Sequence, residues 1–151
     1  LLAGAAGHTY GAAGIWHMAT PEEHRNWGGW DHQPYDLTTW SEGMNFPGSA
    51  QLGRSKALLE TLPWQEFKEQ PEWVGDKVFA AGIPGTIRVI YQPIHGVYNW
   101  NGIEVKNIAP GSWSAYYFDP VSGRRYDLGV HQFDGNWKSP NERLKRLRRL
   151  H

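Results

Sequence analysis

The fold of this chain is decided by a stretch in which side chains alternate, Thr86-Ile87-Arg88-Val89-Ile90-Tyr91-Gln92. Ile87, Val89 and Tyr91 fall on one side of an extended backbone, whereas Arg88 and Gln92 fall on the other. A period of two residues is typical of a β-strand that turns one face toward a core. The stretch therefore predicts a strand over residues 86–92.

The same alternation continues toward the C-terminus. Ile103 and Val105 alternate with Glu104 and Lys106. Further strands are expected at Ser114–Phe118, Tyr126–Leu128 and Val130–Phe133, with turns at Asp119–Gly123 and Asp134-Gly135. These segments leave no room for crossover helices, so residues 76–140 are predicted to form a small antiparallel β-sandwich.

Residues 1–75 have a different character. The small apolar run at Leu1–Ala6 suits a buried helix end, and Thr9–Ile15 is expected to be a short strand and turn. A long polar and aromatic loop over residues 17–37 precedes helices at Thr38–Met44 and Ser49–Thr61, and Pro63 ends the second helix. The leucines of that helix share one face: Leu52, Leu58, Leu59 and Leu62. Strand, loop and helix in this order fit the end of an α/β unit, and Gln70–Asp76 is expected to be a linker.

Charge and composition exclude several classes of protein. The 151 residues carry 15 Lys and Arg and 15 Asp and Glu, which argues against a globally basic nucleic-acid binder. The absence of cysteine excludes disulfides and thiolate metal sites. The opening Leu1–Gly7 has neither the basic start of a signal peptide nor the apolar length of a membrane span, so no membrane partner is expected. Because the chain opens without Met, we expect a fragment cut within an element.

Residues 141–151 form an atypical basic tail. Ser139-Pro140-Asn141-Glu142 is a capping-box pattern, and leucines follow at a spacing of three: Leu144, Leu147 and Leu150. A basic amphipathic helix of this kind can bind membranes, calmodulin-like partners or nucleic acid. The alternative, which we favour, is an aberrant tail appended to a strand domain.

Two aromatic segments are the candidate binding residues. His8 and Tyr10 are two apart between glycines and point to the same side of an extended chain, with Trp16 nearby, so they could form a wall for a sugar. Trp27 and Trp30 lie in the loop Asn26–His32, where indole faces can stack on sugar rings. The alternative in each case is structural: a satisfied histidine, a core tyrosine, and tryptophans that anchor a loop.

Metal and catalytic chemistry find little support in the sequence. His17, His24, Asp31, His32 and Asp36 are close together, but they lack the spacing of zinc or calcium sites, so neither a metal nor a cofactor is expected. Cleavage of a glycosidic bond needs a pair of carboxyl groups, and no pair of acids stands out. A nucleophile elbow and a phosphate-binding loop are also absent. The sequence thus contains a possible wall of a site without its catalytic centre.

Several of these segments resemble the apiosidase-like glycoside hydrolases of bacteria. The first half is similar to their eighth-strand region through Leu2-Ala3-Gly4-Ala5-Ala6-Gly7-His8-Thr9-Tyr10-Gly11, Gly14-Ile15-Trp16, Trp40, Phe46-Pro47-Gly48-Ser49-Ala50-Gln51 and Leu62-Pro63-Trp64. The second half is similar through Arg88-Val89-Ile90-Tyr91-Gln92-Pro93 and Tyr117-Phe118-Asp119-Pro120-Val121-Ser122-Gly123. The resemblance covers residues 1–140, and residues 141–151 depart from it where the family leads to a final apolar strand.

The resemblance implies an α/β plus all-β architecture: the C-terminal end of a (β/α)8 barrel in residues 1–75, then a β-sandwich of the kind often labelled collagen-binding in residues 76–140. It implies that the catalytic carboxylates lie upstream of Leu1, in a missing N-terminal barrel of the same polypeptide. The fragment would then be inactive alone, while His8, Tyr10, Trp16, Trp27 and Trp30 would contact a carbohydrate substrate at the barrel face where such sites form.

The expected function is therefore that of the C-terminal portion of a glycoside hydrolase acting on plant-type, pectic poly- or oligosaccharides. The alternative is a non-catalytic module in which the sandwich binds carbohydrate or collagen through aromatic residues: Tyr98, Trp100, Trp113, Tyr116 and Tyr117. A third possibility is a purely structural buttress, with apolar residues on the surface that faces the barrel. The parent protein is expected to be secreted or periplasmic.

Overall fold

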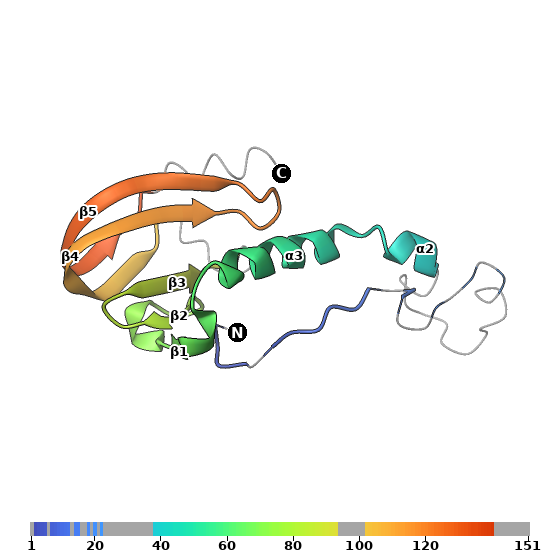
Figure 1. Ribbon diagram of the computed structural model, residues 1–151, viewed down its shortest axis with the longest axis horizontal. Helices are drawn as coiled ribbons and strands as arrows, with labels where there is room; N and C mark the ends of the chain where they lie inside the picture. The colour runs from blue at the N-terminus through green and yellow to red at the C-terminus, as the bar shows by residue number, and fades with distance from the viewer. Residues whose placement is uncertain are drawn as a thin grey trace. The chain divides into compact units, whose positions relative to one another are not determined.

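The computed structural model describes residues 2–5, 7–12, 14, 15, 18, 20, 22, 38–93 and 102–140 (Figure 1). Contacts divide the chain into two compact units. One unit is His8–Leu58, and the other joins Leu1–Gly7 to Leu59–His151.

After Thr38, the described part of His8–Leu58 contains a short helix and the start of a longer one. Helix α2 (Trp40–Gly43) begins with a capping box, in which the Glu42 amide donates to Thr39 Oγ1 at 3.3 Å and the Thr39 amide donates to Glu42 Oε2 at 2.9 Å. Helix α3 (Pro47–Glu60) confirms the helix expected at Ser49–Thr61, and it begins two residues earlier because proline suits a first helical position. Its leucines are half-buried, and none of its residues is buried.

The strand expected at Thr9–Ile15 is wrong over its described residues. Residues 9–12 are not in a strand, and residues 14 and 15 form a turn in which the Ile15 amide donates to the Ala12 carbonyl at 3.2 Å. A β-strand needs the amides and carbonyls of a neighbouring strand, and the described residues of this unit form no strand that could supply them.

The smaller sheet of the other unit contains three antiparallel strands: β1 (Lys68–Glu69), β2 (Phe79–Ile83) and β3 (Ile87–Tyr91). The alternating stretch at residues 86–92 is therefore a strand, as predicted. Phe79 lies opposite Tyr91, and Ala81 lies opposite Val89 on one side and Glu69 on the other. The tight turn between β2 and β3 passes through Gly85, whose φ of 75° is a conformation that glycine adopts without strain.

The second sheet is a long antiparallel hairpin of β4 (Glu104–Phe118) and β5 (Arg125–Lys138), which Figure 1 shows curving past the smaller sheet. The turn predicted at Asp119–Gly123 joins the two strands, where the Gly123 amide donates to the Asp119 carbonyl at 2.7 Å. The described residues thus form mostly antiparallel sheets with few helices.

The turn expected at Asp134-Gly135 is wrong, because β5 runs through it without a break. The pairing register between β4 and β5 shifts on both sides of Ile108, which lies opposite Gly135. Gly135 has a φ of 93°, a value also found in turns. Here this conformation accommodates an irregularity in the strand pairing instead of a chain reversal. Val130–Phe133 and the residues after it are one strand.

A small core forms around a short 3-10 helix, η2 (Pro71–Trp73). Trp73, Val74 and Ala80 are buried against one another, with Val78 and Ile90 packed beside them. The linker expected at Gln70–Asp76 is therefore wrong for its two apolar residues, which belong to the core. A stretch that looks polar in the sequence can still anchor a core through one aromatic side chain.

Candidate functional site

The predicted sugar-binding residues are described only in part. His8 and Tyr10 are both exposed, and Tyr10 retains 38% of its surface. The Tyr10 ring lies against Gly48 at the start of α3: a Cβ atom on Gly48 would come within 2.6 Å of Tyr10 Oη. Trp16, Trp27 and Trp30 lie outside the described residues. The structure thus leaves the proposed wall as a prediction, with Tyr10 anchored to a helix start.

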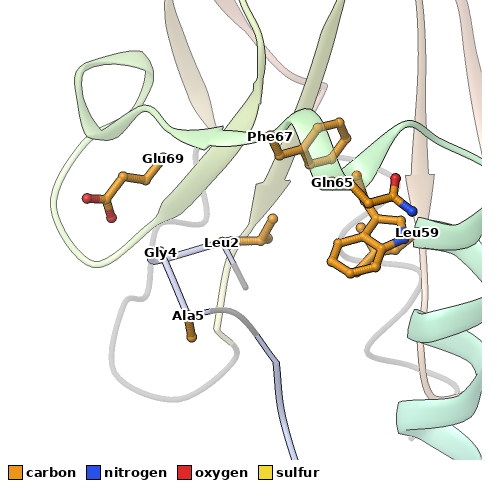
Figure 2. Close-up of a pocket in the computed structure, with 8 residues that line it drawn as sticks. Leu2, Gly4, Ala5, Leu59, Gln65, Phe67 and Glu69 are labelled. Atoms are coloured by element: carbon orange, nitrogen blue, oxygen red, sulfur yellow. The ribbon is translucent and has the colours of Figure 1, made fainter.

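A pocket of about 180 Å³ lies within the other unit (Figure 2). Figure 2 shows Leu59 and Gln65 on one side of it and Glu69 on the other. The pocket is lined by residues of the N-terminal segment, the end of α3 and the chain that follows it: Leu2, Gly4, Ala5, Leu59, Trp64, Gln65, Phe67 and Glu69. None of these residues was predicted as a site residue, although Leu62-Pro63-Trp64 is part of the family resemblance.

Local structure explains how the pocket side chains are presented. After Pro63 the chain forms a 3-10 turn, η1 (Trp64–Glu66), in which the Phe67 amide donates to the Trp64 carbonyl at 3.1 Å. The chain then extends into β1, so Phe67 and Glu69 project to the same side. Gly4 has a φ of 80° and approaches Glu69 so closely that an added Cβ would lie 3.3 Å from Oε2.

The pocket offers aromatic surface with few polar groups. Trp64 and Phe67 are half-buried rings, and Gln65 and Glu69 supply an exposed amide and an exposed carboxylate. Among the lining residues Glu69 carries the one carboxyl group, whereas glycoside hydrolysis uses two. The volume is also below the 300–1,000 Å³ or so of typical ligand pockets. The arrangement can contact part of a sugar ring but lacks the groups to cleave it.

The aromatic residues of the second sheet are mostly part of the packing. His131, Phe133 and Trp137 form a row of ring contacts 5.1 to 5.7 Å apart on one face of β5. Trp113, Tyr116 and Tyr117, expected on a possible glycan-binding face, are half-buried. Tyr98 and Trp100 lie outside the described residues.

The Arg88 side chain lies against two tryptophan rings, and sequence reasoning missed this contact. The Arg88 guanidinium contacts the faces of Trp73 and Trp113, and its Nη1 donates to the Lys106 carbonyl at 2.7 Å. Burial lowers the pKa of Arg88, and the nearby charge of Glu72 opposes that effect. Alternation correctly separated Arg88 from Ile87 and Val89, but a local pattern cannot show that Trp73 and Trp113 cover the arginine side.

Within the described ranges, no three His, Asp or Glu side chains gather into a group that could hold a metal ion. The same part of the chain contains no helix long and apolar enough to cross a membrane.

Comparison with known proteins identifies the first part of the chain. Residues 1–66 match the family model for the apiosidase-like catalytic domain. The resemblance to the apiosidase-like glycoside hydrolases is confirmed over these residues. None of the curated proteins matches the chain in sequence.

A solved structure of a glycoside hydrolase is similar in fold to this chain, with a TM-score of 0.67 and 20% sequence identity. The similarity covers 91% of this chain but 30% of that structure. At this identity the likeness concerns the fold alone. The chain thus spans about a third of the length of the structure that it matches.

Proposed function

We propose that this chain is the C-terminal portion of a glycoside hydrolase acting on plant-type, pectic poly- or oligosaccharides. Residues 1–75 would be the last part of a (β/α)8 barrel, and residues 76–140 a β-sandwich that stabilises it. The observation that carries the proposal is the catalytic-family match at residues 1–66. Support also comes from the fold likeness, which includes nearly all of this chain but a minor part of a glycoside hydrolase.

In this proposal, one wall of the substrate pocket comes from His8, Tyr10, Trp16, Trp27 and Trp30. Aromatic faces stack on the C–H surface of a sugar ring, and the imidazole of His8 supplies a polar contact. The exposure of His8 and Tyr10 is compatible with that role. These residues orient the carbohydrate substrate and do not cleave it.

The cleavage chemistry would belong to two carboxylates in a barrel portion that precedes Leu1 in the same polypeptide. A glycosidase needs one carboxyl to protonate the leaving oxygen and a second to act as nucleophile or base. We therefore expect the 151-residue chain to lack hydrolytic activity by itself.

The test begins with the coding DNA on both sides of this segment, followed by assays of the 151-residue chain and of the longer polypeptide. Aryl-glycosides and pectic oligosaccharides serve as substrates. Activity in the longer polypeptide alone supports the proposal, and hydrolysis by the 151-residue chain overturns the placement of the carboxylates. An open frame that begins just before Leu1, or a longer polypeptide inactive on every substrate, overturns the enzyme proposal.

The wall residues are tested in the longer polypeptide with Tyr10→Ala and Trp27→Ala. Loss of stacking should raise KM about 5- to 30-fold, because such contacts contribute about 1–2 kcal/mol to binding. Val130→Ala is the control, since Val130 is 68% exposed on β5, in the other unit. An unchanged KM in both aromatic variants would remove these residues from the site.

The alternative function is a non-catalytic module that binds carbohydrate or collagen. Exposed aromatic rings of the strand region favour it, above all the Phe79–Tyr91 pair, whose rings retain 42% and 50% of their surface. Affinity electrophoresis of the 151-residue chain in gels that contain pectin, arabinan or xylan, and a collagen pull-down, test this alternative. Unretarded migration in every gel and no capture on collagen would exclude it for these probes.

A further inference from the structure

Strands β2 and β3 carry apolar side chains on both faces of the smaller sheet, with Arg88 as the charged residue of β3 on the inner one. The inner face of this sheet, which carries Ala80 and Ile90, packs on Trp73 and Val74. Its outer face carries six apolar side chains, taken from the direct pairs of β2 and β3: Phe79 with Tyr91, Ala81 with Val89, and Ile83 with Ile87. An antiparallel sheet with one solvated face has polar side chains there, whereas a sheet that reads apolar on both sides is covered on both.

The outer face is already covered at one place. Ala81 retains 1% of its surface, and its direct partner on β1 is Glu69. Glu69 and Phe67 line the pocket together with Leu2, Gly4 and Ala5 (Figure 2). The N-terminal segment, which belongs to the part that matches the catalytic family, therefore lies on the outer side of this sheet.

The pairing with β1 does not reach Phe79, the first residue of β2. Because β1 ends at Glu69, Phe79 has a strand neighbour on one side only, and that neighbour is Tyr91. The two rings are nearly parallel, with centroids 6.5 Å apart and planes inclined by 27°. Phe79 and Tyr91 retain 42% and 50% of their surface. They form a flat, solvent-exposed aromatic patch next to the covered part of the same face.

We propose that the Phe79–Tyr91 pair is a docking surface for the part of the glycoside hydrolase domain that precedes Leu1. This inference rests on the proposed function. Leu2, Gly4 and Ala5 line the pocket beside Glu69, whose strand partner on this face is Ala81, so the segment that leads back to Leu1 lies on the same side of the sheet as the patch. The glycoside hydrolase of similar fold extends well beyond the 30% that this chain matches, which supplies a body large enough to cover it.

The test compares one pair of variants in two polypeptides. Phe79→Glu and Tyr91→Glu are made in the 151-residue chain and in the longer polypeptide encoded with the upstream DNA, with Val130→Glu as the control on an exposed strand position. In the longer polypeptide each aromatic variant should lower the thermal unfolding midpoint by about 5 °C or more, because a charge is buried at the interface. In the 151-residue chain the midpoints should follow that of Val130→Glu.

Other occupants of the patch give different results, and each overturns the proposal. If the 151-residue chain is a dimer by size-exclusion chromatography and the variants are monomers, the occupant is a second copy. If pectin or xylan retards the chain in a gel and the variants lose the retardation, it is a glycan. If the longer polypeptide is active and neither variant changes its thermal unfolding midpoint, the docking surface is overturned while the proposed function stands. An absent upstream frame overturns both.

Discussion

The guanidinium of Arg88 lies 3.9 Å from the centroid of the Trp73 ring. A second ring, that of Trp113 on β4, lies 5.8 Å from the same group. Arg88 also donates to two backbone carbonyls that lie before Ile108 on β4, those of Lys106 and Asn107. One side chain from the smaller sheet thus joins the core of η2 to the long hairpin.

Replacement of this arginine should loosen the contact between the two sheets. Arg88→Met keeps an apolar stem but removes the cation and its donors, so the two carbonyls lose their partners. We expect the free energy of unfolding to fall by about 2–3 kcal/mol, measured by urea denaturation. Arg124→Met is the control, because Arg124 is exposed at the hairpin turn and should change stability by less than about 0.5 kcal/mol. Equal effects in both variants would contradict the role of Arg88.

Gly82 should reject a methyl group that Gly53 accepts. Gly82 has a φ of 157°, and an added Cβ would overlap the Ile87 carbonyl oxygen on the neighbouring strand. Gly82→Ala should therefore cost about 2 kcal/mol or more. Gly53 lies within α3 with open space around it, so Gly53→Ala should stabilise by about 1 kcal/mol. Thermal unfolding of both variants checks the opposite signs, and a stable Gly82→Ala would contradict the close strand contact.

Tyr117 should make stability depend on alkaline pH. Burial raises the pKa of its phenol, and a hydrogen bond with Ser139 partly opposes this. The folded protein then holds the proton more tightly than the unfolded chain, whose tyrosines titrate near pH 10 or so. This contribution is complete below about pH 10 and is lost as the pH rises through the folded value.

The variant Tyr117→Phe isolates that dependence. It removes the titrating group and the hydrogen bond from Tyr117 Oη to the Pro140 carbonyl, which is 3.3 Å long. We expect a loss of about 0.5–1 kcal/mol at pH 8 and a smaller further loss between pH 8 and pH 11 than in the parent chain. Urea unfolding at both pH values measures this difference, and parallel losses would show that Tyr117 does not contribute.

Sequence patterns predicted the strands, helices and turns that depend mainly on residues close together in the chain. The strand at Ile87–Tyr91, the helix at Pro47–Glu60 and the turn after Phe118 follow from alternation, helix periodicity and turn residues. Gly135 shows where this stops. A glycine next to an aspartate suits a turn, but whether its positive φ reverses the chain or serves a strand irregularity depends on the partner strand.

The candidate sites depend even more on distant contacts. The pocket forms because Leu2 and Gly4 lie close to Phe67 and Glu69. Neither segment contains a sequence pattern that predicts this contact. Phe79 and Tyr91 could be placed side by side only once the register of β2 against β3 was known. Residue types therefore suggested a sugar-binding role for His8 and Tyr10, while the pocket and the patch could be found only from the pairing of the folded chain.

The hairpin turn after β4 should depend on one buried carboxylate. Asp119 retains 8% of its surface, and its carboxylate accepts hydrogen bonds from the amides of Val121 and Ser122 at 3.0 and 3.2 Å and from the Ser122 hydroxyl. Asp119→Ala leaves these donors without their acceptor, so the free energy of unfolding should fall by about 1–3 kcal/mol. Asp119→Asn keeps one acceptor oxygen and should lose less stability. Asp134→Ala is the control, because Asp134 is exposed on β5. If urea denaturation gives the same midpoint for Asp119→Ala and Asp134→Ala, the carboxylate does not hold the turn.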